Sequence, residues 1–279
     1  MSNIFIAGCG KIGTQLGIEL LAAGHRVWGL RRTRMDDDSG IQWIQADLTN
    51  PASLTQLPSD IDFLYYTAAA SEYTINAYIQ AYTTGVENLQ RAWRANPPRH
   101  VMFVSSTAVY DYADGRWVNE DSPTQPKHFS GQSVLHGERA WHWPVTAIRS
   151  AGIYGPGRQQ FLESVRLRKA ALSAEPVYTN RIHSDDLVGF LKHLLTVPKR
   201  HTHYVACDNE PALKNTVITW LAQKLGVAAP IGLSPEQEPQ RGNKRCSNQR
   251  LRESGYILKY PTFREGYAAI LGEKLGEPL

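Results

Sequence analysis

The sequence predicts an α/β fold in which a doubly wound parallel sheet is followed by a smaller C-terminal α/β lobe. Three observations support this prediction. β-rich runs alternate with helical patterns over the first 150 residues, a glycine-rich turn separates the first strand from the first helix, and the chain has 279 residues. Parallel strands need crossover connections, which helices supply. A chain of this length has room for one large α/β unit and a smaller one.

The first half contains the regular alternation. We expect strands at Asn3–Ala7, His25–Leu30, Ile41–Ala46, Phe63–Thr67, His100–Ser105 and Val145–Arg149. Helical spacing predicts helices at Ile12–Ala23, Asn76–Ala95 and Ser130–His142. Gly24 is a typical helix end, and Pro97 with Pro98 stops the second helix.

The second half is less regular after Gly155-Pro156-Gly157. Its expected elements are helices at Gln159–Ala171, Ser184–Leu195, Asn215–Leu225, Asn248–Ser254 and Thr262–Leu271, a strand at His203–Ala206 and a long loop at Pro230–Lys244. We therefore place a first domain at residues 1–155 and a smaller substrate lobe at 156–279, with about 179–200 returning to the first domain. Such a lobe would cover the carboxyl ends of the strands, where open α/β sheets bind ligands.

The composition excludes several classes of protein. Hydrophobic residues make up 42% and charged residues 20%, so a sizeable core can be buried. The net charge is only +4 without a dense basic stripe, which argues against nucleic acid as the main partner. Cys9, Cys207 and Cys246 form no CxxC pair, so we expect no disulfide framework and no metal site. No secretory signal and no apolar stretch of membrane-spanning length is present, so we expect a cytoplasmic protein without a membrane partner. A homodimer is compatible with these features.

A GxGxxG pattern, Gly8-Cys9-Gly10-Lys11-Ile12-Gly13, lies between the first strand and the first helix. In the Rossmann fold the first glycine permits the tight turn, the second lets the backbone approach a pyrophosphate, and the third allows close helix–strand packing. The diphosphate would lie against the amides that begin the helix. The alternative is a glycine turn in another α/β fold, but the placement favours a dinucleotide site.

The end of the second strand indicates which dinucleotide is bound. NAD-binding proteins commonly place an acidic residue there for the ribose 2′-hydroxyl. This chain has Arg31 and Arg32 instead. Guanidinium groups suit bidentate contact with a phosphate, so NADP is favoured over NAD. A solvated basic pair is the alternative interpretation.

Two further segments follow strands in the order that the fold requires. Asp47-Leu48 resembles a contact to the adenine edge, with the carboxylate accepting from the amino group. Thr67-Ala68-Ala69-Ala70 offers small side chains where the cofactor would pass close to the backbone.

Several segments together resemble the extended short-chain dehydrogenase/reductase superfamily, the NAD-dependent epimerases and dehydratases. They are Val104–Tyr110 (VSSTAVY), Arg149–Arg158 (RSAGIYGPGR), Arg181–Asp186 (RIHSDD) and the tail from Ser247 to Pro261. The resemblance implies NAD(P) binding and oxidoreductase, epimerase or dehydratase chemistry on sugar nucleotides or related small molecules. It also implies that the hydroxyl of Ser106 contacts the substrate.

Two departures from the family pattern stand out. The family's first glycine falls on Ala7, and the catalytic YxxxK pair is missing, with Ser130 at the Tyr position and Val134 at the Lys position. This pattern is similar to the atypical, YeeZ-like subgroup. A serine hydroxyl is far less acidic than a phenol beside an ammonium group, so the usual proton transfer is not encoded.

His128 and Tyr154 are conceivable substitutes for the missing pair, although a loop position and a packing role are the simpler interpretations. Three functional hypotheses remain. The chain is an NADP-dependent oxidoreductase or epimerase-like enzyme with an unusual acid–base group, a catalytically silent NAD(P)-binding sensor or regulator, or a scaffold with a vestigial pocket. The glycine loop, the paired arginines and Ser106 argue against the scaffold.

Overall fold

The computed structural model describes residues 1–33, 37–228, 230, 232 and 242–272. Two compact units make up the chain. The first consists of Met1–Asp111, Pro123–Arg149 and Val188–Tyr204, and the second of Tyr112–Ser122, Ser150–Leu187 and Val205–Leu279. Tyr112–Ser122 thus joins the second unit although it lies within the range that the sequence assigned to the first domain. Most of the loop expected at Pro230–Lys244 lies outside the described residues.

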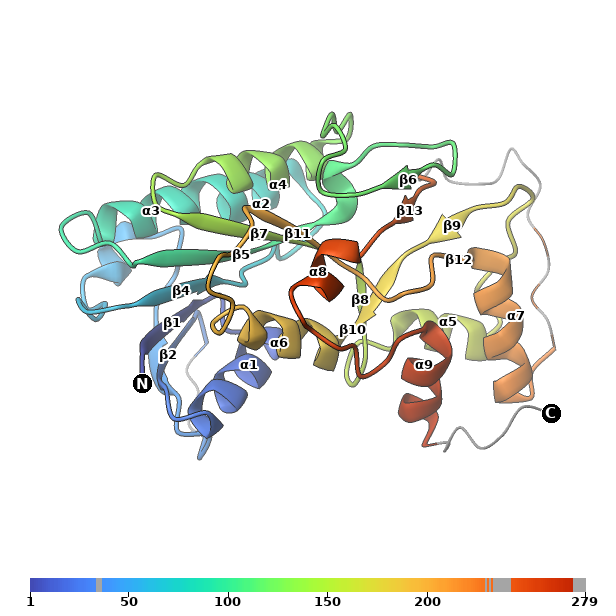
Figure 1. Cartoon of the computed structure of the whole chain (residues 1–279), viewed down its shortest axis with the longest axis horizontal. Helices are drawn as coiled ribbons and strands as arrows, with labels where there is room; N and C mark the ends of the chain where they lie inside the picture. Colours follow the sequence, from blue (N-terminus) through green and yellow to red (C-terminus); the bar gives the residue numbers. More distant parts are fainter. Residues whose placement is uncertain (34–36, 229, 231, 233–241, 273–279) are drawn as a thin grey trace. The chain divides into compact units, whose positions relative to one another are not determined.

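A seven-stranded sheet forms the centre of the fold, in the order β11-β7-β5-β4-β1-β2-β3 (Figure 1). Its strands are β1 (Asn3–Ala7), β2 (Arg26–Arg31), β3 (Gln42–Gln45), β4 (Phe63–Tyr66), β5 (His100–Ser106), β7 (Val145–Ser150) and β11 (His203–Ala206). β3, β2, β1, β4 and β5 pair in parallel with their neighbours. The chain order reverses between β1 and β4, and this is the switch point of a doubly wound sheet. The predicted fold class is confirmed.

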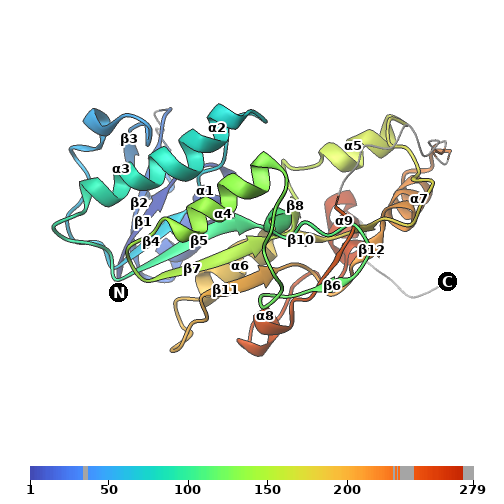
Figure 2. The ribbon, with the colours of Figure 1, turned by 90° about the horizontal axis from the view of Figure 1, so that it is seen from above.

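Helices cover both faces of this sheet. α2 (Ile75–Ile79), α3 (Gly85–Ala92) and α4 (Phe129–Arg139) lie over one face, and α1 (Lys11–Ala22) and α6 (Ser184–His193) over the other (Figures 1 and 2). With helices on both sides, the strands read as continuous apolar runs, and Ile4 to Ala7 of β1 are fully buried.

The helix expected at Asn76–Ala95 contains a π-helical turn at Gln80–Thr84, between α2 and α3. The buried hydroxyl of Tyr66 donates a hydrogen bond to the carbonyl of Ala81 within this turn. A side chain that enters the backbone ladder in this way widens a helix locally.

A buried ion pair connects α4 with β7 in the first unit. Arg149 donates to both carboxylate oxygens of Glu138, with Nη2 to Oε2 at 2.8 Å, and both side chains are at most 5% exposed. Arg149 Nη1 also donates to the Tyr110 hydroxyl at 2.7 Å, and Ser105 donates to Glu138. These bonds satisfy charges that would otherwise be costly to bury.

The second unit is built from pairs of short strands. β8 (Gly152–Tyr154) pairs in parallel with β10 (Arg181–His183), β6 (Trp117–Val118) in parallel with β13 (Arg245–Cys246), and β9 (Tyr178–Thr179) antiparallel with β12 (Ala212–Leu213). Its helices are α5 (Gln160–Arg166), α7 (Lys214–Leu225), α8 (Gln249–Glu253) and α9 (Phe263–Leu271). Side chains from β8, α5, α7 and α9 form its hydrophobic core.

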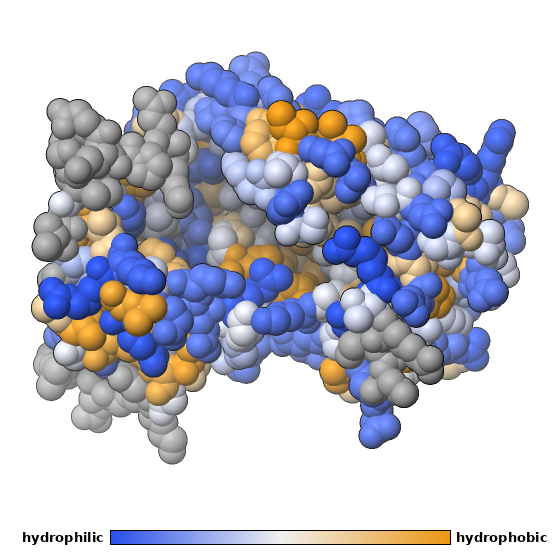
Figure 3. Space-filling view, turned by 180° about the vertical axis from the view of Figure 1, so that it is seen from behind, coloured by the Kyte–Doolittle hydropathy of each residue, from blue (hydrophilic) through white to orange (hydrophobic). Residues whose placement is uncertain are grey.

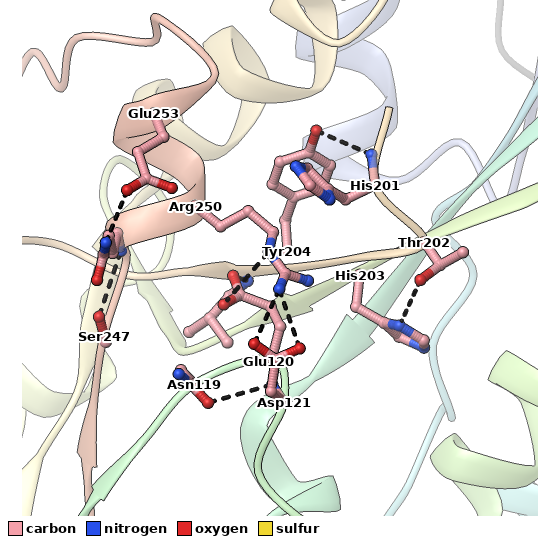
Figure 4. A network of polar contacts seen from close by, with 12 residues as sticks. Asn119, Glu120, Asp121, His201, Thr202, His203, Tyr204, Ser247, Arg250 and Glu253 are labelled. Atoms are coloured by element: carbon pink, nitrogen blue, oxygen red, sulfur yellow. Dashed lines mark hydrogen bonds and ion pairs between the residues drawn. The ribbon is translucent and has the colours of Figure 1, made fainter. Parts of the chain in front are cut away.

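A polar network within the second unit fixes the turn that follows β6 (Figure 4). Glu120 accepts a hydrogen bond from the amide of Val205 at 2.7 Å, and Arg250 of α8 lies 3.0 Å from Asp121 and 3.9 Å from Glu120. Glu120 is buried, so this bond fixes the turn to the backbone of Val205.

Large exposed hydrophobic side chains are scattered over the described surface. Among them are Ile18, Leu167 and Ile257, which lie on different elements. On the rear face, Figure 3 shows groups of hydrophobic residues that are separated by hydrophilic residues. Isolated exposures of this kind are ordinary for a folded protein.

Candidate functional site

The glycine loop after β1 has a distinct geometry at each glycine. Gly8 has a φ of +78°, and a Cβ placed on it would lie 2.3 Å from the Cα of Ala68. A Cβ on Gly13 would lie 2.9 Å from the Thr67 hydroxyl, so the third glycine lets α1 approach the segment that follows β4. The loops after β1 and β4 therefore contact one another at the switch point.

Gly10 differs from the other two because its Cβ position is open. The nearest heavy atom would be the carbonyl oxygen of Gly8 at 3.9 Å, and the residue is exposed. Gly10 is the N-cap of the twelve-residue helix α1, where no side chain caps the helix and no acidic residue occupies the first turn. Such a helix start, with an open approach, is suited to an anion such as a pyrophosphate. Lys11 is exposed, whereas Ile12 and Gly13 are buried.

Arg31 and Arg32 stand at the end of β2, as the sequence suggested. The Arg31 guanidinium lies 6.0 Å from the centre of the Trp43 ring, and Arg32 is exposed. A carboxylate that the sequence reasoning passed over, Asp37, faces this region. Hydrogen bonds from Ser39 and Trp43 lower the pKa of Asp37, and the nearby positive charge of Arg31 lowers it further.

Two of the other residues expected to contact the cofactor, Asp47 and Leu48, already accept hydrogen bonds from within the protein. Asp47 Oδ1 accepts from the amide and the hydroxyl of Thr49, both at 2.8 Å, which leaves Oδ2 as the second acceptor of this half-buried carboxylate. Leu48 is half-buried, and its carbonyl accepts from Asn88. Ala68 is half-buried and Ala69 exposed.

Ser106, Ser130 and Val134 come from two neighbouring elements. Ser106 ends β5, and its Oγ accepts from the amide of Ala108 at 3.1 Å. Gly131, at the start of α4, packs so closely on this turn that a Cβ there would lie 2.4 Å from the Ala108 carbonyl. Ser130 is half-buried, but Val134, one helical turn later, is only 3% exposed and belongs to the core of the first unit.

Tyr73 is a further polar residue beside Ser130, and the sequence reasoning did not single it out. Its hydroxyl lies 3.1 Å from His128 Nδ1 and 3.4 Å from Ser130 Oγ. The only sequence signal was its position shortly after Thr67–Ala70 at the end of β4.

Tyr154 lies in the hydrophobic core of the second unit, whereas the glycine loop belongs to the first unit. It is 5% exposed, its ring centroid is 4.5 Å from that of Tyr267, and its hydroxyl has no hydrogen-bond partner among the described residues. Burial raises the pKa of the Tyr154 phenol far above its ordinary value, with the charge of Asp208 as a further cause. These observations favour the packing interpretation of Tyr154.

Within the described part of the chain, no group of three or more His, Cys, Asp or Glu side chains is arranged to hold a metal ion. No helix there has the length and apolar character needed to cross a membrane.

Known proteins resemble this chain over most of its length. The family model for the NAD-dependent epimerase/dehydratase family matches residues 4–206. The curated protein YeeZ of Escherichia coli K12 is 30% identical over 247 residues, which cover 82% of this chain and 86% of YeeZ.

Solved structures agree with this likeness. A protein from Methylobacillus flagellatus, assigned to the NAD-dependent epimerases/dehydratases, is 38% identical with a TM-score of 0.84 and covers 97% of this chain and 98% of its own. At 21% identity, two others share the fold: human SDR39U1 with NADPH (TM-score 0.80; 97% and 99% covered) and MoeE5 with UDP-glucuronic acid and NAD (TM-score 0.79; 95% and 96% covered). The chain belongs to the NAD-dependent epimerase/dehydratase family.

Proposed function

We propose that this protein binds NADP(H) and carries out oxidoreductase or epimerase-like chemistry on a sugar nucleotide or another small molecule in the cytoplasm. The observation that supports this most strongly is the loop Gly8–Gly13. It combines a positive φ at Gly8, an open approach at Gly10 and an uncapped helix start. Together these features are suited to the binding of a pyrophosphate.

The remaining contacts follow from the fold. The pyrophosphate would lie over Gly10 and against the amides of Lys11, Ile12 and Gly13, because the Gly10 amide itself donates to the Gly8 carbonyl at 2.7 Å. Arg31 and Arg32 would bind the 2′-phosphate. Asp47 Oδ2 would accept from the adenine amino group beside Leu48, while Thr67, Ala68 and Ala69 would border the cofactor at the end of β4. When bound, the nicotinamide supplies hydride transfer.

The preference for NADP rests on charge. Two guanidinium groups at the end of β2 complement a phosphate, and charge-assisted hydrogen bonds of this kind contribute about 1.5–3 kcal/mol. The 2′-hydroxyl of NAD would offer them a neutral partner. Among the fold neighbours, human SDR39U1 was solved with NADPH and MoeE5 with NAD.

On the substrate side, Ser106 would donate a hydrogen bond to the reacting oxygen of the substrate. Ser130 and Val134 occupy the places of the usual Tyr and Lys, so the charge that normally lowers the phenol pKa is missing. The fold neighbour MoeE5 binds UDP-glucuronic acid, and this supports a sugar nucleotide as the substrate class.

The alternative function is a sensor that binds NADP(H) without turnover, and the missing Tyr–Lys pair specifically favours it. Binding and turnover separate the two. The purified protein is titrated with NADPH and NADP⁺, then mixed with nucleoside diphosphate sugars and small carbonyl compounds. NADPH absorbance reports net reduction or oxidation, and chromatography of the sugars reports epimerisation, in which the cofactor is regenerated. Binding with turnover supports the enzyme, binding without turnover supports the sensor, and failure to bind NADPH contradicts both.

A further inference from the structure

Three polar side chains meet at the start of α4, and we call Tyr73, His128 and Ser130 the hydroxyl–imidazole cluster. His128 Nδ1 lies 3.1 Å from the Tyr73 hydroxyl and 3.4 Å from Ser130 Oγ, and the two hydroxyl oxygens are 3.4 Å apart. Imidazole is the commonest general acid–base group in proteins. The cluster therefore brings an acid–base group to the residue that replaces the family's tyrosine.

Aromatic packing holds the cluster in place. The rings of Tyr73 and His128 stack, with centroids 5.8 Å apart and an interplanar angle of 25°. The ring of Phe129 lies 5.0 Å from Tyr73 and 4.9 Å from His128, and Tyr78 meets Tyr73 edge-on at 5.7 Å. These ring contacts fix the side chains of the cluster. The cluster is nevertheless open to water, because Tyr73 is 64% exposed and His128 is also exposed.

The cluster lies beside the turn that carries Ser106. Gly131 follows Ser130 directly and packs against the carbonyl of Ala108, whose amide donates to Ser106 Oγ. Replacing Gly131 by a larger residue would push the start of α4 away from this turn, because the Cβ would come within 2.4 Å of the Ala108 oxygen. Gly131 thus keeps the start of α4, which carries Ser130, against the turn that follows Ser106.

We propose that the hydroxyl–imidazole cluster supplies the proton transfer that the missing Tyr–Lys pair performs in typical members of the family. This inference rests on the NADP-dependent function proposed above. Ser130 exchanges a proton with the substrate oxygen, His128 is the proton reservoir, and Tyr73 positions the imidazole.

The proton balance is simple in the direction of carbonyl reduction, with a reduced nicotinamide dinucleotide as reductant. As the carbonyl carbon gains a hydride, its oxygen takes the Ser130 hydroxyl proton with the former π electron pair. Ser130 Oγ regains a proton from Nδ1 of the His128 imidazolium. The imidazole, now neutral, accepts a hydrogen bond from the Tyr73 hydroxyl and then takes up one proton from the solvent, which is the proton that the net reaction consumes. Oxidation of an alcohol follows the same path in reverse.

The first test measures proximity to the cofactor without turnover. Diethyl pyrocarbonate modifies exposed histidines, and peptide mass spectrometry gives the modification rate at each one. His136 serves as the internal reference because it is exposed on the same helix, about 12 Å further along. At an NADPH concentration about ten times its Kd, we expect modification of His128 to slow about tenfold. The rate at His136 should not change.

A matched ligand shows which part of the cofactor protects His128. 2′-Phospho-ADP-ribose has the same adenosine half but lacks the nicotinamide, so we expect it to leave His128 reactive. Equal modification of His128 with and without NADPH, or equal protection by 2′-phospho-ADP-ribose, would overturn the inference. Failure of NADPH to bind at all would instead show that the proposed function is wrong.

The second test measures the proton transfer itself, with NADPH-dependent reduction of the small diketone diacetyl. We expect H128Q and S130A to lower kcat by about 10²–10⁴-fold, the usual contribution of a general acid–base group. Y73F should lower kcat less and leave KM unchanged, because it disturbs only the orientation of the imidazole. All three variants should retain the wild-type Kd for NADPH. Equal kcat in wild type and H128Q, including no turnover by either while NADPH is bound, contradicts the inference.

Discussion

Gly8 and Ala68 approach one another so closely that a Cβ on Gly8 would lie 2.3 Å from the Cα of Ala68. Gly8 follows β1 and Ala68 follows β4, so this contact fixes the two loops that meet at the switch point of the sheet. Gly8 also has a φ of +78°, which side-chain-bearing residues rarely adopt. The glycine is thus required for two independent reasons.

Replacing Gly8 with Ala should therefore cost more than the backbone conformation alone. A left-handed φ costs a residue other than glycine about 1–2 kcal/mol, and the displaced Ala68 backbone adds to this. Gly24 is the matched control, since it has a φ of +81° but no atom within 4 Å of its Cβ position. We expect urea unfolding to show a larger loss of stability in G8A than in G24A. Equal losses would mean that the loops separate freely.

Gly10→Val should have the opposite pattern, with a normal fold and impaired cofactor binding. The Cβ position of Gly10 is open, and its φ of −85° and ψ of −154° suit a β-branched residue. The valine methyl groups would occupy the approach to the helix start. We expect an unchanged unfolding midpoint and an NADPH affinity at least about tenfold weaker, which corresponds to 1.4 kcal/mol. Wild-type affinity in a folded G10V protein would place the pyrophosphate elsewhere.

Asp37→Asn should strengthen NADPH binding, because the carboxylate shares the surroundings of Arg31. Removing its charge removes repulsion of the 2′-phosphate, and the amide oxygen of Asn can still accept the hydrogen bonds from Ser39 and Trp43. Exposed charge interactions are worth about 0.2–1 kcal/mol, so the expected gain is small. Fluorescence titration in low salt, with D38N as control, measures it. Weaker NADPH binding by D37N would show that the carboxylate itself contacts the cofactor.

Stability should depend on pH through Asp208 in the second unit. Burial raises the pKa of this carboxyl to about 7, nearby Arg181 opposes the rise, and Oδ2 has no hydrogen-bond partner among the described residues. The folded protein therefore holds a proton that the unfolded chain releases near pH 4. The stability that this proton supplies is present below pH 4 and is lost as the pH rises toward 7.

Asp208→Asn tests this dependence because asparagine stays neutral. We expect the free energy of unfolding of the wild type, relative to D208N, to fall between pH 4 and pH 7. Urea unfolding of both proteins at several pH values gives the difference directly. A difference that stays constant over this range would mean that Asp208 ionises normally in the folded state.

The sequence was informative where the chemistry is local and the elements are long. The Gly8–Gly13 pattern and the apolar strands identified the sheet, because glycine spacing and burial on both faces leave a clear signal. The paired strands β8 with β10 and β6 with β13 were missed, since runs of two or three residues carry no periodicity. The π turn at Gln80–Thr84 depends on the Tyr66 hydroxyl, a tertiary contact that helical spacing does not encode.

The candidate site could also be predicted only in part, namely where a residue lies in a recognisable motif or at a strand end. The candidate residues were marked in the sequence by family motifs and strand ends, as for Ser106 and Arg31. Tyr73 lies 55 residues before His128, and only folding brings their side chains together. The sequence showed that the usual acid–base pair is missing, but only the structure shows what lies beside Ser130.

The proposed function depends on the binding of NADP(H) through the glycine loop and the arginines that end β2. Isothermal titration calorimetry with NADPH and NADH tests it directly, on wild type and on the double variant R31A/R32A. We predict that wild type binds NADPH more tightly than NADH, by about 1.5–3 kcal/mol, and that the double variant loses this preference while still binding NADH. Equal affinity of the wild type for the two cofactors would contradict the NADP assignment, and binding of neither would contradict the proposed function as a whole.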